Sequence, residues 1–422
     1  MSPTTIPGNL IIQSPAANDP LLDLNTQPSL DLQFATSKTL DDRVSGQNLI
    51  TFSRSTTGTY VDSNGIIQTA AIDAPRFDHD PTTNASLGLL VEESRENLVT
   101  NSEDLTGWST IFAGDGVNPT VQNISDTAPD GGTTVTEITF QRNTANTSDY
   151  SLYREQYGTT AVSTGSVYVK AARPSDVGKV IDFYHNQGAP IDFNSVTLTD
   201  TWQRVSSVGA GVIAGFLTLG LYSATSSTGQ VKILAWGAQL EEGAFATSYI
   251  PTSGSTVTRA ADVASITGSN FSGWYNDTGV GTWYYESSAE YADVILECIF
   301  TVGSNTNGYS FNKNWGSAAR INSRLNNSGG SLDITVNNAW TQGGPGKWAI
   351  GLEDNNAKLY HSSGLSGADT ACIVPIVGSA TNLSLRKSGI TSLANDGASS
   401  TIARLTYYPY RLPDATLQEI TS

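Results

Sequence analysis

Five aromatic residues lie beside amide, carboxylate or ammonium side chains, the combination that binds sugars. A pyranose presents an apolar face that stacks on an aromatic ring, and its hydroxyls need polar partners nearby. We predict a carbohydrate-binding role for Tyr150, Tyr153, Tyr157, Trp315 and Trp340. The same residues fit an alternative in which they belong to a half-buried core or a subunit interface, and the sequence leaves both interpretations open.

Carboxylates occur as adjacent pairs, but their spacing does not favour hydrolytic chemistry. Neighbouring side chains on a strand point to opposite faces, so no pair alone supplies the two facing carboxylates that glycoside hydrolysis needs. The pairs are Asp41–Asp42, Glu92–Glu93 and Glu241–Glu242. The run Asp78, His79, Asp80 precedes a proline, and we interpret it as a loop with an architectural role. We predict no catalytic residues and no enzymatic activity.

Metal-ligating patterns are weak in this chain. The three histidines, His79, His185 and His361, are far apart and form no zinc motif. Calcium is the one cofactor that we consider, because the loops 275–279, 352–356 and 395–397 carry Asp and Asn oxygens. Ordinary turn chemistry explains the same residues, so the metal ligands stay undefined. Two cysteines are present. Each lies in an apolar run, which favours buried free thiols at Cys298 and Cys372.

Charge and apolar content limit the partners of the chain. Its 422 residues include 22 Lys and Arg against 39 Asp and Glu, a net charge of −17. Nucleic acids and anionic membranes need clustered cations, so we expect neither as a partner. The first residues lack the basic and apolar regions of a secretory signal. The longest apolar stretch, 210–222, is too short to cross a membrane and alternates like a strand. We therefore expect folding in a cytoplasm, without membrane insertion.

The composition and the apolar rhythm predict an all-β fold. Ser, Thr, Asn, Gly, Val, Ile and aromatic residues dominate, and they suit strands and turns. Short alternating runs recur every ten to fifteen residues, a spacing typical of antiparallel sandwiches. Asn64-Gly65 predicts a two-residue hairpin turn. In the run 231–242, Leu234, Trp236, Ala238 and Leu240 are expected on one face. Pro413 and Asp414 predict the start of a C-terminal helix.

We divide the chain into four parts. We expect an extended N-terminal docking arm, a small β-rich attachment module and two antiparallel β-sandwich domains of jelly-roll type. Four tryptophans in strand patterns, Trp202, Trp236, Trp283 and Trp348, are expected in the cores. The predicted boundaries are 1–30, 31–104, 105–262 and 263–422.

Several motifs resemble those of known families. The segments Phe52–Gly65 (FSRSTTGTYVDSNG), Pro75–Pro81 (PRFDHDP) and Leu87–Asp104 (LGLLVEESRENLVTNSED) resemble a stretch common in tailed-phage virion proteins of the tail-fibre type. The segment Trp236–Asp262 looks like the end of the sandwich that follows in such proteins, which is similar to jelly-roll carbohydrate-binding modules. The end of the chain, Ala403–Thr421, looks like a concanavalin A-like or laminin-G-like sandwich.

The resemblance implies a structural protein on a virion surface: a fibre, a spike or a capsid decoration. It implies that the N-terminal arm docks on other virion proteins, that the sandwiches attach to host-surface glycans, and that the chain forms a homo-oligomer, with a trimer favoured by analogy with phage fibres. Two alternatives remain. A purely structural decoration protein would bind no ligand, and a polysaccharide depolymerase would cleave the host glycan.

Overall fold

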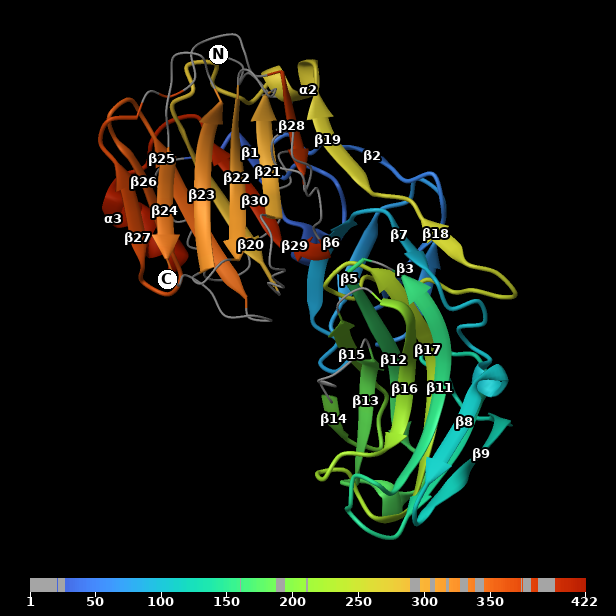
Figure 1. The fold of residues 1–422 in the computed structure, drawn as a ribbon. Coiled ribbons are helices and arrows are strands. Elements are labelled where there is room, and N and C mark those ends of the chain that lie inside the picture. Colours follow the sequence, from blue (N-terminus) through green and yellow to red (C-terminus); the bar gives the residue numbers. More distant parts are fainter. Residues whose placement is uncertain are drawn as a thin grey trace, which may run out of the picture.

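The chain folds into two β-sandwiches joined by a smaller β-rich junction (Figure 1). The computed structural model describes residues 21, 27–159, 161–186, 194–209, 212–288, 297–303, 308–315, 319–326, 333–337, 345–372, 374, 381–385 and 399–422. The strands of both sandwiches pair in antiparallel fashion. The prediction of an all-β fold with two antiparallel sandwiches is therefore confirmed.

We call the sandwich built from residues 105–242 the middle sandwich. Its first sheet contains, in spatial order, β15 (Gln203–Gly209), β12 (Ser163–Ala171), β17 (Gly229–Glu242), β10 (Thr134–Arg142) and β9 (Gly116–Ser125). Its second sheet contains β14 (Asn194–Thr197), β13 (Val180–Asn186), β16 (Val212–Leu221), β11 (Tyr150–Thr159) and β8 (Ser109–Ala113). Two short 3-10 helices, η1 (Leu105–Gly107) and η2 (Pro174–Asp176), flank these strands. Leu217, Leu219 and Leu221 alternate into the core, as their spacing predicts.

The second sandwich, which we call the C-terminal sandwich, also has two sheets. One contains β1 (Leu30–Leu32), β30 (Arg404–Tyr408), β20 (Gly281–Ser287), β25 (Gly346–Leu352), β26 (Ala357–His361) and β27 (Ser366–Asp369). The other contains β2 (Thr51–Ser53), β19 (Val263–Thr267), β28 (Asn382–Leu385), β21 (Glu297–Gly303), β22 (Gly308–Trp315), β23 (Ala319–Asn326) and β24 (Asp333–Asn337). Trp283 and Trp348 are fully buried between the sheets, as expected.

The described residues include three short α-helices: α1 (Phe34–Ser37), α2 (Ser269–Ser272) and α3 (Asp414–Thr421). Helix α3 confirms the predicted C-terminal helix, with Pro413 at its N-cap and Asp414 in its first turn. Leu417 and Ile420 anchor it on the C-terminal sandwich beside Tyr408. Within the described residues, no helix is long and apolar enough to span a lipid bilayer.

The sequence predicts a separate module over 31–104, and the strands of this region pair partly with one another and partly with later parts of the chain. Strand β1 pairs with β30 and β2 pairs with β19, so both extend the C-terminal sandwich. In the junction, β5 (Arg76–His79), β6 (Ser86–Glu92) and β29 (Ser399–Ile402) form one sheet. The other two junction sheets are the hairpin of β3 (Gly58–Val61) and β4 (Ile67–Ala70), and the pair of β7 (Arg95–Asn97) and β18 (Val257–Arg259). The predicted arm lies mostly outside the described residues.

Buried charges hold the junction together, and we call them the junction ion cluster: Arg54, Arg76, Glu92, Arg259 and Asp262. Arg76 binds Glu92 at 2.8 Å and also contacts Asp262. Arg54 binds Asp262 at 3.0 Å, and Arg259 lies 3.5 Å from Glu92. Burial alone would raise the pKa of Glu92, but Arg259 and Arg76 hold that pKa well below its usual range. The ion pairs of Asp262 with Arg54 and Arg76 link residues 208 and 186 positions apart in the sequence.

A β-bulge in β17 reverses which side chains face the core. Ile233 and Ala235 point into the middle sandwich, whereas Leu234 and Trp236 pack on its outer side, near Ile67 and Tyr249. The pairing with β12 shifts around Gly237, whose φ is +65°. After it, Ala238 and Leu240 face inward. The prediction of one common face for these four residues is therefore wrong, because one extra residue flips the alternation.

The predicted hairpin at Asn64-Gly65 forms, but its turn is one residue longer. Asp62 and Ile66 close the loop through a backbone hydrogen bond of 2.8 Å. Gly65 takes the left-handed conformation, with φ at +78°, whereas Asn64 does not. The Asp62 carboxylate accepts hydrogen bonds from the backbone amides of Asn64 and Ile66. These hydrogen bonds to the Asp62 side chain hold the longer loop in place, whereas a two-residue turn is held by its backbone alone.

Candidate functional site

Tyr153, one of the predicted sugar-binding residues, belongs to the core of the middle sandwich. Its side chain is 1% exposed and stacks on Trp108 at 5.7 Å between ring centroids. Its hydroxyl donates a hydrogen bond to the Leu105 carbonyl and accepts one from the Trp108 amide at 3.2 Å. Tyr153 therefore has no ring face to offer to a ligand.

Tyr157 points to the same side of β11 as Tyr153, towards the core. It is half-buried and stacks on His185 at 4.7 Å. Burial lowers the pKa of His185 to about 4, so this imidazole is neutral at pH 7. Trp315 ends β22 opposite Ala319, and its side chain lies outside the described residues, as does all of Trp340. Of the three predicted tyrosines, Tyr153 and Tyr157 thus lie on the core side of β11.

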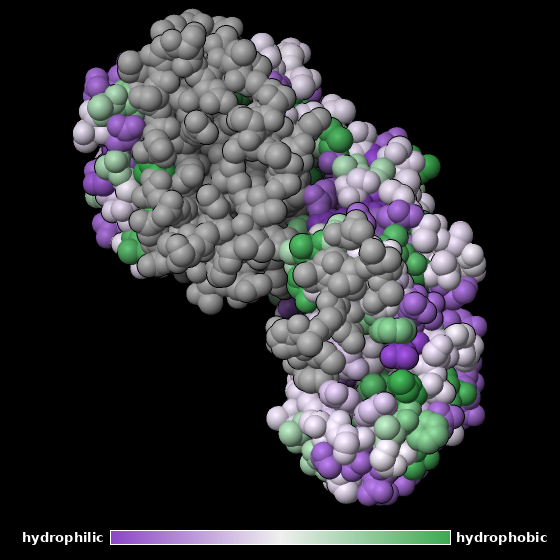
Figure 2. Space-filling model, viewed as in Figure 1, coloured by the Kyte–Doolittle hydropathy of each residue, from purple (hydrophilic) through white to green (hydrophobic). Residues whose placement is uncertain are grey.

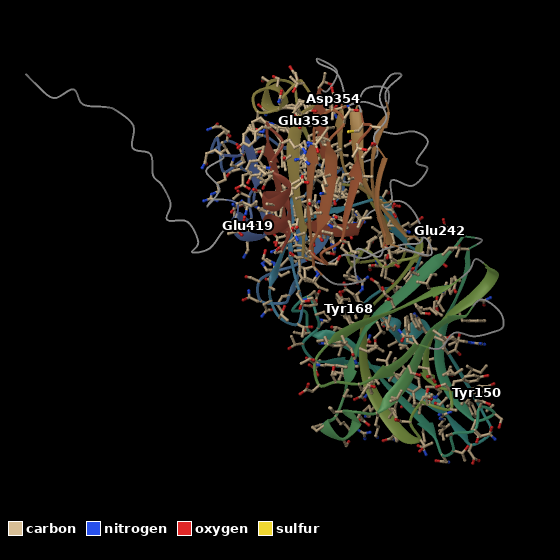
Figure 3. All side chains as sticks on the ribbon, turned by 90° about the vertical axis from the view of Figure 1, so that its left-hand side faces the viewer. Tyr150, Tyr168, Glu242, Glu353, Asp354 and Glu419 are labelled. Atoms are coloured by element: carbon tan, nitrogen blue, oxygen red, sulfur yellow. The ribbon has the colours of Figure 1, made fainter. Side chains whose placement is uncertain are left out.

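Tyr150 points to the outer side of the same sheet, where it joins other aromatic residues. Its ring lies 5.5 Å from that of Tyr222, which in turn lies 6.5 Å from Tyr184. Figure 3 shows Tyr150 towards the end of the middle sandwich that is remote from the junction. We call this outer surface the aromatic face and define it by Tyr150, Arg154, Gln156, Tyr184, Phe216 and Tyr222.

Strand register explains why these residues meet. The pairing of β11, β16 and β13 sets Thr218 opposite both Arg154 and Tyr184. Since Leu217, Leu219 and Leu221 point into the core, alternation sends Phe216, Thr218 and Tyr222 to the outside. Three strands that are separate in the sequence thus contribute to one surface. Figure 2 shows hydrophobic and hydrophilic residues side by side on this sandwich.

The backbone that carries Tyr222 is held from two directions. Asp182, which is fully buried, accepts hydrogen bonds from the amides of Tyr222 at 2.9 Å and Ser223 at 2.7 Å. Arg142, also fully buried, donates to the carbonyl oxygens of the same two residues. Side chains locked by buried hydrogen bonds preorganise a binding surface. The sheet therefore presents Tyr222 in a fixed place.

A cation lies on the aromatic face beside the tyrosines. The guanidinium carbon of Arg154 lies 3.8 Å from the centroid of the Phe216 ring, a close cation–π contact. Tyr184 is 4% exposed, and burial raises the pKa of its phenol, which therefore stays protonated at neutral pH. Gln156 is exposed at the next outward position of β11. Together they offer ring faces, hydrogen-bond donors and one positive charge.

The carboxylates considered for catalysis have structural partners. Glu92 belongs to the junction ion cluster, and Glu241 accepts hydrogen bonds from the amide and hydroxyl of Thr247. Glu242 accepts one from Thr159. None of these contacts joins two carboxylates across a cavity.

The run Asp78, His79, Asp80 falls partly in strand β5, where the sequence predicts a loop. Asp78 accepts a hydrogen bond from the Val61 amide at 2.7 Å, and His79 Nδ1 lies 3.0 Å from the Val61 carbonyl oxygen. Asp80 caps the following turn by accepting from the amides of Thr82 and Thr83. The interpretation of this run as architectural agrees with these contacts.

The loops considered for calcium use their oxygens within the protein. The Asn276 side chain accepts from the Thr278 amide, and Asp354 accepts from the Val374 amide at 2.9 Å. Figure 3 places Glu353 and Asp354 at the end of the C-terminal sandwich remote from the junction. Among the described residues, no three His, Cys, Asp or Glu side chains gather as metal ligands. The loop 395–397 lies outside the described residues.

Of the two cysteines, Cys372 is described in full. It is a buried free thiol, and burial raises its pKa. Its sulfur donates a hydrogen bond to the Glu353 carbonyl at 3.3 Å. The Cys298 side chain lies outside the described residues.

Four members of the aromatic face are not predicted from the sequence: Arg154, Tyr184, Phe216 and Tyr222. A signal was present in the run 216–222, where Phe216, Thr218 and Tyr222 alternate with the leucines assigned to the core. Alternation along this strand predicts its outward-facing residues as directly as its inward-facing leucines. The neighbours on β11 and β13 depend on register, which local sequence does not contain.

Comparison with known proteins shows only distant similarity. No family model matches the chain, and no curated protein matches it. Among solved structures, the CBM40 module of the Ruminococcus gnavus IT-sialidase bound to α2,3-sialyllactose has 14% sequence identity and a TM-score of 0.30, covering 34% of this chain and 82% of that one. The same module without ligand has 15% identity and a TM-score of 0.29, covering 34% and 83%. These values do not place the chain in a family.

Proposed function

We propose that this chain is a non-enzymatic surface protein of a phage virion that binds a glycan through the aromatic face. The observation that supports glycan binding is the pair of partly exposed rings of Tyr150 and Tyr222 on an outer sheet surface, with the buried Tyr184 ring packed beside Tyr222. Rings fixed on a rigid sheet suit stacking against sugar faces, because little side-chain freedom is lost on binding. The amide of Gln156 supplies hydrogen bonds for hydroxyl groups.

A glycan array with the full chain tests this site. We expect binding by the unaltered protein and loss of at least about tenfold in affinity for Tyr150→Ala and Tyr222→Ala, because each removes a stacking surface. Tyr60→Ala is the matched control, since Tyr60 is a half-buried tyrosine on the β3–β4 hairpin. Equal binding by all three variants would exclude the aromatic face as the site.

The array and an assay for reducing ends separate the alternatives. Absence of any bound glycan would favour a purely structural decoration protein. Release of reducing ends from a bound polysaccharide would indicate a depolymerase, and this activity would have to disappear on substitution of a particular carboxylate.

The virion role rests on the resemblance of residues 52–65, 75–81 and 87–104 to tail-fibre-type proteins. We propose that the N-terminal arm docks on other virion proteins, and that the assembled protein is a trimer on the particle surface. Immunogold imaging of purified particles and light scattering of the isolated chain test these two points. A chain absent from particles would contradict the first, and a monomer at micromolar concentration would contradict the second.

A further inference from the structure

We infer that the aromatic face binds a sugar that carries a carboxylate, and that Arg154 is the group that recognises it. This inference rests on the proposed function and defines the chemical class of its ligand. It comes from the bonding state of Arg154 rather than from the tyrosines, which suit neutral and acidic sugars equally.

Arg154 differs from the other arginines whose side chains the structure describes. Each of those donates a hydrogen bond or forms an ion pair within the chain. The fully buried Arg142 binds backbone carbonyls, Arg173 binds Asp176, and Arg404 binds Asp31. The rest are held in the same way: Arg43, Arg54, Arg76, Arg95, Arg204, Arg259 and Arg411. Among the described residues, Arg154 has neither kind of contact. Its Nε is buried without an acceptor, a feature that it shares with Arg76, Arg95, Arg204 and Arg259, so the missing contacts of its terminal nitrogens are what distinguish it.

The two terminal nitrogens of Arg154 are not among the buried atoms and have no partner in the described residues, so a ligand can reach them. The Phe216 ring holds the guanidinium plane in place at 3.8 Å, but a ring satisfies no N–H group. The edge of the guanidinium therefore keeps its fork of parallel donors. This fork matches the two oxygens of a carboxylate, which bind it in a bidentate way.

The charges around Arg154 also favour an acidic ligand. The chain has a net charge of −17, yet no carboxylate of the described residues forms an ion pair with this arginine. Glu155, the next residue, points to the opposite side of β11 because alternate side chains face opposite ways. Asp182, on the neighbouring strand β13, is occupied by the amides of Tyr222 and Ser223. Because the described residues supply no carboxylate to Arg154, we assign the negative partner to the ligand.

The tyrosines place such a partner beside ring surfaces. Tyr184 and Arg154 flank Thr218 from the two neighbouring strands, and Tyr184 contacts Tyr222. A sugar ring that stacks on the tyrosines would hold its carboxylate next to the guanidinium. Two kinds of sugar carry this group, hexuronic acids and nonulosonic acids, and the shared carboxylate is what the inference specifies.

The test compares acidic glycans with their neutral counterparts. The full chain is titrated with a hexuronic acid oligosaccharide, a nonulosonic acid oligosaccharide and the carboxyl-reduced form of each. We expect the unaltered protein to prefer at least one acidic form by about tenfold or more, because a charge-assisted bidentate contact contributes about 1.5–3 kcal/mol. In Arg154→Gln this preference should disappear, while binding of the reduced form stays unchanged. Arg154→Lys should recover only part of it, because lysine keeps the charge without the fork.

Lys170→Gln is the matched control for charge. Lys170 also lies over an aromatic ring, 4.9 Å from the centroid of Trp202, but on the outer side of the opposite sheet. Lys170→Gln removes one positive charge, as Arg154→Gln does, and should keep the preference for acidic glycans. Thermal unfolding of each variant establishes that the fold is intact.

The outcomes separate the inference from the proposed function. Equal binding of acidic and reduced forms, unaffected by Arg154→Gln, would overturn the inference and leave glycan binding intact. A preference for sulfated over carboxylated sugars would also overturn it. Absence of binding to any glycan would overturn both. A preference lost in Arg154→Gln but kept in Lys170→Gln would establish Arg154 as the recognising group.

Discussion

Three tyrosines of one strand show how position on a sheet decides the role of a residue. Tyr150 lies on the aromatic face, whereas Tyr153 and Tyr157 face the core. The sequence places all three in one polar context, and composition alone does not distinguish them. The difference arises because side chains alternate along β11 and only one face of this sheet packs against the core.

Substitution of Tyr153 should therefore affect stability and leave ligand binding intact. We expect Tyr153→Ala to lower the free energy of unfolding by about 3–5 kcal/mol, the usual cost of removing a large buried aromatic side chain. Urea unfolding measures this change. Tyr150→Ala, at the partly exposed end of the same strand, should cost less than about 1 kcal/mol. If the two variants lost the same stability, the assignment of Tyr153 to the core would be contradicted.

Two neighbouring aspartates should respond to pH in opposite directions. Burial raises the pKa of Asp78 to about 6. Its charged form is thus disfavoured in the folded state, and stability falls as pH rises from about 4 to about 6. Hydrogen bonds from Thr83 and Thr82 lower the pKa of Asp80. Asp80 therefore adds stability above its ordinary pKa of 3.8 and loses it as pH falls through the lowered value.

Paired variants test this difference. Between pH 4 and pH 7, Asp78→Asn should gain stability relative to the unaltered protein, because it removes the buried charge. Over the same pH range, Asp80→Asn should be less stable than the unaltered protein, because it removes a charge that the folded state stabilises. Urea midpoints measured at four pH values give both trends. If both variants changed stability in the same direction relative to the unaltered protein, the opposite pKa shifts of Asp78 and Asp80 would be contradicted.

At the scale of single elements, strand β17 shows what local sequence does and does not determine. Its alternation of large and small apolar residues predicts a buried strand, and this prediction is confirmed. The sequence does not predict which side chains of β17 face the core, because the bulge at Gly237 adds one residue relative to the paired strand β12. A glycine in a strand is a known sign of a bulge, so Gly237 was the one available signal.

Replacement of Gly237 tests the importance of that bulge. Its φ of +65° is strained for any residue with a Cβ, and an added Cβ would lie 3.1 Å from the Tyr168 ring. We expect Gly237→Ala to lower the free energy of unfolding by about 1–2 kcal/mol. Gly107→Ala, at an ordinary backbone conformation with open space around it, should change stability by less than about 0.5 kcal/mol. Denaturant unfolding of the two variants gives the comparison.

The candidate site itself was predicted only in part. Tyr150 was identified from its polar neighbours, but its partners Tyr184 and Tyr222 come from other strands. Strand pairing over such sequence separations is set by the whole core, since register depends on which faces are buried. The local pattern of 210–222 predicted a strand at β16, while the composition of the outer surface required the assembled sheet.

At the scale of the whole molecule, the two sandwiches are tied together by segments that lie far apart in the chain. Strands β1 and β2 belong to the C-terminal sandwich, whereas Asn97, in β7, bonds to the carbonyl oxygens of Ala238 and Ile250 beside the middle sandwich. The residues between them contribute Arg54, Arg76 and Glu92 to the junction ion cluster. Strands from the first hundred residues therefore belong partly to the C-terminal sandwich and partly to the junction, so a boundary drawn along the sequence does not follow the sheets.

The junction ion cluster should determine how firmly the two sandwiches are connected. Asp262 accepts hydrogen bonds from Arg54, Arg76 and the Glu92 amide, and it is almost fully buried. Removing its charge would leave two buried guanidinium groups undercompensated, a change that costs about 3–5 kcal/mol in comparable buried pairs. We expect Asp262→Asn to lower the free energy of unfolding by this amount and to increase the radius of gyration in small-angle scattering, because the ion pairs hold together the junction through which the sandwiches are connected. Asp414→Asn is the matched control, since Asp414 pairs with Arg411 and Lys358 at the surface, where such pairs contribute at most about 1 kcal/mol. A loss in Asp262→Asn no larger than in this control would mean that the connection depends on the paired strands and not on the buried charges.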